Sequence, residues 1–504
     1  MIPQRGSART ASIPAPIGGW NARDSLANMD AMDAVTMLNW FPTPSDIQFR
    51  KGFTKRCTGF TGKANSLMNW AGPSSQIMFA AVGSVIYNVQ GTTAVSVITG
   101  LGSDKWQHVN ITTAGGHFLV ICNGVDAVRV FDGTSWSTPT ITGVTSSTLV
   151  NVNLFKNRLY FTQKDTLKVW YLPVNSISGA ANPLDFGAIA RNGGYMQAMG
   201  TWTLDAGQGA DDYAVFVTSM GEVIVYNGTD PTDPATWALK GVWQLGQTFN
   251  RRCFYKWSGD LLLLTQDGLV PLASALQSSR LDPRVNLTDK IYYAVSLAAT
   301  TYSTLFGWQI IYFASENMLI LNIPTSIGME QYVMHTITKS WARFSGFDAN
   351  CFEIQNDRVY FGSNGYIGKF WDTNSDNGAN ITGQVQQAYN YFEIRGQQKR
   401  FTLARPILLT DNGVPSILLN VSTDFQEQNN LGAVQFNPGA YAVGLWDASL
   451  WDQATWGGTL TVNKDWQGIT GIGYCAGLNL SIASQNIEVH WASTDIVFET
   501  GGIL

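Results

Sequence analysis

The sequence predicts an all-β protein built around a β-propeller, and three observations support this prediction. One pattern, an alternating apolar run, a short turn and a second apolar run, occurs seven times between residues 76 and 372. The turns follow one another at about 40 to 56 residues, close to the length of a four-stranded propeller blade. The chain also contains 50 glycines and 18 tryptophans, which favour turns and pleated surfaces over helices. Seven blades are expected, and six or eight would also fit the spacing.

Each repeat is expected to contribute an inner strand followed by a hairpin. The hairpins are expected at residues 77–90, 117–132, 158–172, 213–227, 260–273, 310–324 and 358–372. The inner strands are expected at residues 66–71, 108–113, 150–156, 196–204, 252–258, 295–301 and 350–355. Neighbouring blades bury their faces against one another, so repeats that cannot fold alone become stable in a ring.

The repeats define three regions: an N-terminal arm over residues 1–45, the propeller over residues 46–378 and a C-terminal domain over residues 379–504. The arm is polar and contains one expected short helix, residues 31–39, with Asp30 as its N-cap. The sequence Trp40-Phe41-Pro42 should end this helix.

The last repeat contains only three recognisable strands, so the ring needs an outer strand from elsewhere. Residues 46–56 alternate in the manner of a strand and directly precede the first repeat. We expect this segment to close the ring, because a closed ring leaves no long unpaired edge. The expected ring-closure residues are Asp46, Ile47, Phe49 and Phe53.

The repeat is lost after residue 382, and the C-terminal domain is expected to be an antiparallel β-sandwich. Residues 400–410 and 416–424 are expected to pair as a hairpin around a turn at residues 411–413, and further strands are expected at 474–483 and 487–499. An intervening loop contains three candidate interface residues, Trp446, Trp451 and Trp456.

Charge and composition restrict the class of partner. The net charge is −5 and the isoelectric point is near 5.4, so the chain offers no basic field for tight binding of DNA. The first residues lack the apolar core of a signal peptide, and no apolar run reaches the length of a membrane span, so synthesis in a cytoplasm is expected. The five cysteines are widely spaced and expected to be reduced, and the four scattered histidines indicate no metal site.

Catalytic residues are not expected. A glycosidase requires two carboxylates beside one sugar bond, but Glu353 is the single acid among the seven expected inner strands. Nucleotide-binding, hydrolase and metalloprotease motifs are absent from the sequence, and no cofactor is expected. Arg251 and Arg252 are interpreted as a solvated or ion-paired couple, and they join the candidate interface residues.

Short stretches at both ends of the chain resemble a known family. The N-terminal stretches are residues 14–26 (PAPIGGWNARDSL), 29–34, 39–42 (NWFP) and 50–52 (RKG), and the C-terminal stretches are residues 456–458 (WGG) and 499–504 (ETGGIL). They are similar to stretches in the tail nozzle or hub proteins of short-tailed phages (podoviruses), also called tail stabilisation proteins.

This resemblance implies a structural protein of the virion with no catalytic residue. It implies a hexameric tube below the portal and its adaptor, through which duplex DNA leaves the capsid and to which fibres or spikes attach. The acidic balance is compatible with a conduit to which DNA does not adhere. The alternative is a propeller that binds or cleaves carbohydrate, since propellers host both kinds of function.

Overall fold

The computed structural model describes residues 8–205, 210–276, 285–411, 413–426, 432–433 and 460–501. By compactness the chain divides into two units, neither of which is continuous in sequence. The propeller unit comprises Lys55–Glu330 and Asp348–Phe370, and the terminal unit comprises Met1–Thr54, Gln331–Phe347 and Trp371–Leu504. This division differs from the expected one at 45 and 378, because the N-terminal segment and residues 331–347 fold with the C-terminal region.

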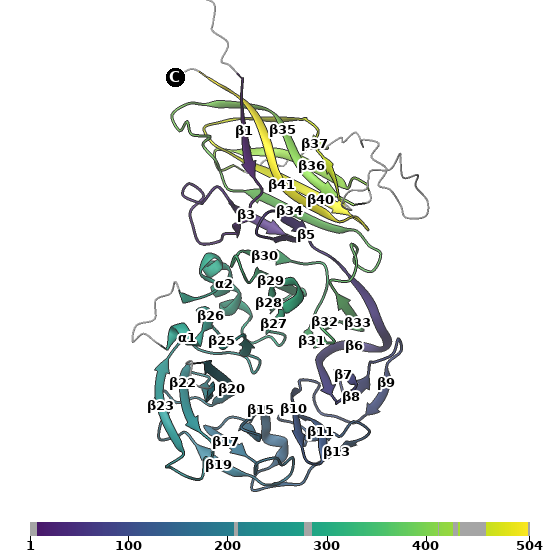
Figure 1. Cartoon of the computed structure of the whole chain (residues 1–504), viewed down its shortest axis with the longest axis vertical. Helices are drawn as coiled ribbons and strands as arrows, with labels where there is room; N and C mark the ends of the chain where they lie inside the picture. The colour runs from purple at the N-terminus through teal and green to yellow at the C-terminus, as the bar shows by residue number, and fades with distance from the viewer. Residues whose placement is uncertain are drawn as a thin grey trace, which may run out of the picture. The chain divides into compact units, whose positions relative to one another are not determined.

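The propeller unit is a β-propeller, in which successive antiparallel sheets surround a common centre (Figure 1). Four groups of four strands follow one another, the first as part of a larger sheet and the other three as separate sheets. They are β6 (Phe53–Ala71), β7 (Gln76–Val82), β8 (Val85–Asn88) and β9 (Val95–Ile98); β10 (Gln107–Thr113), β11 (Gly116–Cys122), β12 (Arg129–Phe131) and β13 (Trp136–Ser137); β15 (Leu149–Phe155), β16 (Arg158–Gln163), β17 (Lys168–Tyr171) and β19 (Asn182–Asp185); and β20 (Met196–Asp205), β21 (Ala210–Thr218), β22 (Glu222–Gly228) and β23 (Trp237–Gln244).

The rest of the propeller unit is less regular. It contains the strands β24 (Phe254–Trp257), β25 (Asp260–Thr265) and β26 (Gly268–Pro271), the pair β27 (Gln309–Phe313) and β28 (Met318–Pro324), and the strands β31 (Cys351–Gln355), β32 (Arg358–Gly362) and β33 (Asn364–Phe370). The connections contain a short parallel pair, β14 (Ile141–Thr142) and β18 (Gly179–Ala180), the helices α1 (Leu272–Ala275) and α2 (Tyr292–Tyr302), and the 3-10 turns η1 (Ser146–Thr148), η3 (Asp289–Ile291) and η4 (Ala314–Glu316).

All seven expected hairpins are present as antiparallel pairs. The expected inner strand at residues 295–301 is wrong, because this segment lies within helix α2. Val295, Ala298 and Ala299 are the buried residues of that helix, and their spacing of three and four places them on one helical face. In this repeat β27, the first strand of the expected hairpin, takes the innermost position instead.

The core of the propeller unit lies between neighbouring sheets rather than at the centre of the ring. One cluster joins the sheet of β15 to the sheet of β20, and in it the rings of Tyr160 and Trp237 stack at 6.4 Å. Similar clusters lie between the sheets of β6 and β10 and between those of β10 and β15. Burial of these faces therefore holds the ring together.

Strand β6 closes the ring, because it lies between β33 and β7 and so joins the last and the first repeat in one sheet. Closure by a strand from residues 46–56 was expected, but the closing strand begins at Phe53 and extends to Ala71. Phe53 is the first residue of β6, whereas Ile47 and Phe49 belong to β5 (Ile47–Phe49) in the terminal unit. Asp46 lies directly before β5 and contacts His490 of the same unit.

The terminal unit contains two mainly antiparallel sheets. One has the strand order β38 (Thr461–Asn463), β35 (Lys399–Thr410), β41 (Val489–Thr500), β5 and β4 (Trp40–Pro42), with β1 (Ala8–Pro14) on β41 and β39 (Gln467–Gly473) on β35. The other has the order β29 (Met329–His335), β30 (Trp341–Phe344), β3 (Asp33–Leu38), β34 (Ile381–Gln387), β40 (Ala476–Ser484), β36 (Ser416–Thr423) and β37 (Gly432–Ala433), with β2 (Gly19–Trp20) on β3.

Two local predictions fail in the terminal unit. The expected helix at residues 31–39 is instead strand β3, which pairs with β34, and Asp30 accepts a hydrogen bond from the Met32 N–H within a turn. The expected hairpin of residues 400–410 and 416–424 does not form, because β35 pairs with β41 and β36 pairs with β40. In both cases partners distant in sequence override the local pattern. The sandwich itself stays a prediction.

Among the described residues no helix has the length and apolar character needed to span a membrane.

Candidate functional site

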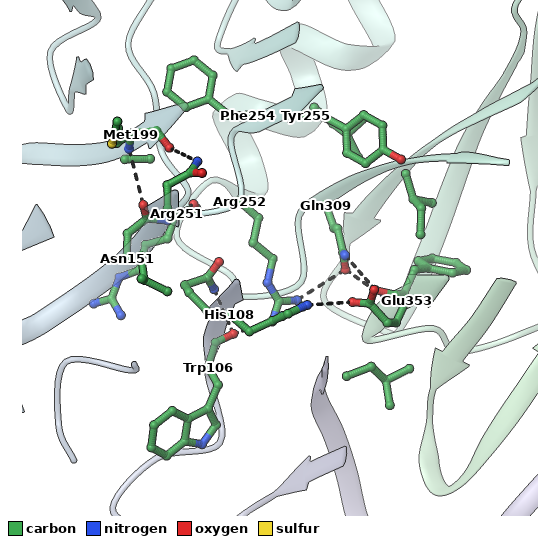
Figure 2. Close-up of a pocket in the computed structure, with 18 of the residues that line it drawn as sticks. Trp106, His108, Asn151, Met199, Arg251, Arg252, Phe254, Tyr255, Gln309 and Glu353 are labelled. Atoms are coloured by element: carbon green, nitrogen blue, oxygen red, sulfur yellow. Dashed lines mark hydrogen bonds and ion pairs between the residues drawn. The ribbon is translucent and has the colours of Figure 1, made fainter. Parts of the chain in front are cut away.

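The candidate functional site is a cavity of about 260 Å³ at the centre of the propeller unit. Its wall comes mainly from the first strands of the sheets, namely β6, β10, β15, β20, β24, β27 and β31. The ring therefore brings polar groups from distant parts of the sequence into one space, as Figure 2 shows for the labelled side chains.

Arg252 crosses this cavity from the segment that precedes β24. Its Nη2 donates hydrogen bonds to the backbone oxygens of Asn65 and Trp106, both at 3.2 Å, and to Ser66 Oγ at 3.0 Å. Its Nη1 lies 3.4 Å from Gln309 Oε1, an interaction drawn in Figure 2. One guanidinium thus connects β24 with the neighbourhoods of β6, β10 and β27.

Arg251 makes a second connection across the cavity. Its Nη1 donates to the backbone oxygen of Asn123 at 3.0 Å, beyond the end of β11. Its own backbone oxygen accepts a hydrogen bond from Asn151 Nδ2, on β15, at 3.3 Å. The two consecutive arginines therefore bridge the centre of the propeller beside the cavity.

A histidine and a glutamate meet beside Arg252. His108 Nε2, on β10, lies 3.4 Å from Glu353 Oε2, on β31 (Figure 2). Burial raises the pKa of Glu353 to about 8, although its backbone hydrogen bond and the charge of Arg252 act in the opposite direction. Burial, helped by the charge of Arg252, lowers the pKa of His108 to about 4. At pH 7 the two groups therefore meet largely as a carboxylic acid and a neutral imidazole.

Asparagine side chains connect the inner strands to one another. Asn110 Nδ2, on β10, donates to the backbone oxygen of Asn69, on β6, at 2.8 Å. Asn153 Nδ2, on β15, donates to the backbone oxygen of Met199, on β20, at 2.8 Å. The sequence shows asparagines on several expected inner strands, but not the hydrogen bonds by which they join one strand to the next.

The cavity wall has limited catalytic chemistry. An acid with a pKa of about 8 can donate a proton near neutral pH. However, Glu353 is the single carboxylate among the described residues that line the cavity, and hydrolysis of a glycosidic bond normally uses two. The groups that dominate the wall are donors of hydrogen bonds, chiefly guanidinium and amide groups.

The candidate interface residues fall in two places. The structure locates Arg251 and Arg252 in the wall of the central cavity, whereas the sequence suggested a solvated or ion-paired couple. The remaining candidates lie outside the described residues, and they are Trp446, Trp451 and Trp456.

The terminal unit contains a further cluster of ionisable groups. His490 Nδ1 lies 3.1 Å from Asp46 Oδ2, and His490 Nε2 lies 3.2 Å from Glu488 Oε1. Burial alone would lower the pKa of His490, but hydrogen bonds to the two carboxylates outweigh burial and raise it. The cluster joins β5 to β41, and its geometry is that of a structural clasp.

No protein-family model and no curated protein matches the chain. Several solved structures are similar to it. They include the computationally designed Ika8 protein (10% identity, TM-score 0.36, 63% of this chain and 100% of that chain), the Cps50 (Swd1) β-propeller domain of Myceliophteria thermophila (12%, 0.37, 65% and 98%) and Sqt1 of Saccharomyces cerevisiae (13%, 0.37, 66% and 96%). At these identities and TM-scores the similarity says nothing about function.

Proposed function

We propose that this chain is a structural subunit of the tail nozzle, or hub, of a short-tailed phage. Six copies form a ring below the portal and its adaptor, duplex DNA passes between the copies, and fibres or spikes attach to the ring. The chain is synthesised in the host cytoplasm and is incorporated into the virion tail.

The observation that carries this proposal is which sequence segments belong to the terminal unit. The stretches that resemble nozzle proteins come from opposite ends of the sequence, and their described residues all belong to this unit. Strand β1 pairs with β41, so that Ala8 lies opposite Glu499. Directly after β1, the Ala15 N–H donates to the backbone oxygen of Ala492 at 3.0 Å. The resemblance therefore covers parts of one folded unit rather than unrelated tails.

The same segments supply some of the buried polar contacts of that unit. Arg50 Nε donates to Asn39 Oδ1 at 2.8 Å, which joins the expected family stretches RKG and NWFP. Gly52 lies so close to Ser375 that an added Cβ would meet the backbone oxygen at 2.0 Å. Replacement of this glycine would displace the backbone around it, which gives a physical reason for a recognisable sequence at this place.

The bridged propeller supports a conduit between copies rather than through one copy. Arg251 and Arg252 cross the centre of the ring of strands, and the space beside them is about 260 Å³. A DNA duplex is far broader, since its major groove alone is about 12 Å wide. Passage of DNA therefore requires an opening that several subunits enclose.

A propeller that binds or cleaves carbohydrate is the alternative, and the cavity does not favour cleavage. Its wall presents two guanidiniums and one carboxylate, whereas the common hydrolytic mechanism places a carboxylate on each side of the bond.

Imaging of the virion tests the proposal. Phage particles that carry this chain would be purified, their tails reconstructed by electron cryomicroscopy, and the chain identified by its fold and by mass spectrometry. We expect six copies around the tail axis, next to the portal and adaptor. A single copy on the axis, or a location outside the tail, would contradict the proposal. The test uses virions because we expect the subunits to assemble only on the adaptor, so the isolated chain can be monomeric.

A further inference from the structure

The central cavity of the propeller unit contains more positive than negative charge, although the whole chain has a net charge of −5. Arg251 and Arg252 line it, and Glu353 is the one carboxylate among the described residues of its wall. Neither guanidinium forms an ion pair with a carboxylate of the described residues. A partly enclosed cation that forms no direct ion pair is unfavourable, so the cavity suits an anion.

Both arginines also have donors to spare. Arg252 uses its two Nη atoms, and Arg251 uses Nη1, for the contacts across the cavity. Among the described residues the Nε–H of Arg252 and the Nε–H and Nη2–H groups of Arg251 have no hydrogen-bond partner. A guanidinium with free neighbouring donors suits the oxygen atoms of a carboxylate, phosphate or sulfate group.

The position of Arg252 is fixed before any ligand arrives. Its guanidinium carbon lies 4.9 Å from the ring centre of Phe306, and Lys105 Nζ lies 5.0 Å from the same ring. The ring and the backbone acceptors hold the guanidinium in place, and the lysine adds a further positive charge nearby. Such preorganisation reduces the entropic cost of binding.

We propose that the central cavity of the propeller is a binding site for a small oxyanion, held by Arg251 and Arg252. The ligand is a carboxylate or a tetrahedral phosphate or sulfate group, either free or at the end of a small molecule. The cavity volume of about 260 Å³ accommodates such a group together with water. This site is independent of the proposed role in the phage tail.

Glu353 gives the site a dependence on pH. The titratable or charged groups around it are His108, Arg252, Tyr255 and Cys351. Burial lowers the pKa of His108 to about 4, raises that of Cys351 to about 12 and raises that of Tyr255, so Glu353 is the group that titrates between pH 7 and 9. Its ionisation introduces a negative charge that competes with the ligand.

The test uses the full chain and sulfate, whose charge is constant between pH 7 and 9. Binding would be measured by calorimetry and by the thermal shift, against sodium chloride at equal ionic strength. We expect a rise in Tm specific to sulfate. The affinity should fall from pH 7 to pH 9, by about tenfold where only the form with protonated Glu353 binds, because a pKa of about 8 lowers the protonated fraction by that factor. Glu353→Gln should abolish the fall and keep the binding.

Arg251→Gln should remove sulfate binding, and the exposed Arg358→Gln on β32 is the matched control that should retain it. Arg251 is the better target, because Arg252 makes more contacts between sheets and its loss can prevent folding. Acetate in place of sulfate distinguishes the ligand class: stronger binding of acetate supports a carboxylate ligand, and stronger binding of sulfate supports a phosphate or sulfate group. A shift equal to that of chloride, or full binding by a folded Arg251→Gln variant, would overturn the proposal.

Discussion

Arg50 is one of the largest fully buried side chains of the terminal unit, and Asp376 compensates its charge. Arg50 Nη2 lies 2.6 Å from Asp376 Oδ2, and Nη1 lies 2.8 Å from Oδ1. Removal of one partner of a buried pair leaves the other charge without compensation. We therefore expect Asp376→Asn to lower the free energy of unfolding by about 3 kcal/mol, as measured by urea denaturation.

The control for this variant is an exposed ion pair. Lys168 Nζ and Asp185 Oδ2 are 3.8 Å apart, and both side chains are about half exposed. Asp185→Asn should change the free energy of unfolding by less than about 1 kcal/mol, since water screens such pairs. Equal losses in both variants would show that the burial of Arg50 is not the cause.

His490 predicts a specific dependence of stability on pH. Because its pKa is raised above 6.5 in the folded state, its contribution is fully present below pH 6.5 and disappears as the pH rises through the folded pKa. Asp46 acts in the opposite sense: burial tends to raise its pKa, but hydrogen bonds from His490 and Thr43 outweigh this and lower it below 3.8. The contact between His490 and Asp46 should thus stabilise the fold most at pH values above the folded pKa of Asp46 and below that of His490.

The measurement compares the wild type with His490→Gln. The difference in the free energy of unfolding between the two should be largest on the acidic side of pH 6.5, before Asp46 is protonated, and should shrink at alkaline pH. A difference that stays constant from acidic to alkaline pH would rule out titration of His490 as the source.

The cysteines should be present as unreactive thiols. All five are buried and unpaired, and burial raises the pKa of each one. Since the thiolate is the reactive form, a thiol reagent should label the native protein slowly and find five free thiols after denaturation without reductant. A substantially lower number would contradict the prediction of reduced cysteines.

At the scale of the element, ring closure depends on the continuity of strand β6, because this strand joins the last and the first repeat. It contains Gly59 and Gly62, whose φ angles are +101° and +103°. Residues with a side chain do not readily adopt such angles, and even asparagine favours values near +57°. Gly62→Asn should therefore destabilise the propeller unit by about 1 to 3 kcal/mol, as measured by urea denaturation.

The same substitution at Gly83 is the matched control. Gly83 stands in the turn between β7 and β8, its φ is +57°, and nothing lies within 4 Å of an added Cβ. Asparagine tolerates this conformation, so Gly83→Asn should cost less than about 0.5 kcal/mol. If the two variants are equally stable, the backbone of β6 is not a constraint on ring closure.

At the scale of the whole molecule, charge governs the relation to DNA. A net charge of −5 should make binding of duplex DNA weak at physiological salt and only slightly dependent on salt, because few counterions are released. Electrophoretic mobility shift or fluorescence anisotropy over a series of salt concentrations would measure both quantities. Submicromolar affinity with a steep salt dependence would argue against a conduit wall that lets DNA pass.

The periodic sequence by itself determined the propeller and its seven hairpins. Each hairpin depends on alternating side chains and a nearby turn, such as the one at Gly83, and these are local interactions that the sequence displays directly. The isolated position of Glu353 among the inner strands was also visible, as were the five cysteines without a spacing typical of metal sites or disulfides.

Only the tertiary structure decided the elements and sites that depend on distant partners. Residues 33–38 form a strand because they pair with β34, and residues 295–301 form a helix because Val295 and Ala299 are buried on one face. Arg251 and Arg252 line a cavity because the ring brings their acceptors near Asn123 and Ser66 to the centre. Local propensities differ by less than the free energy of such burial and pairing, so contacts between distant segments decided these cases.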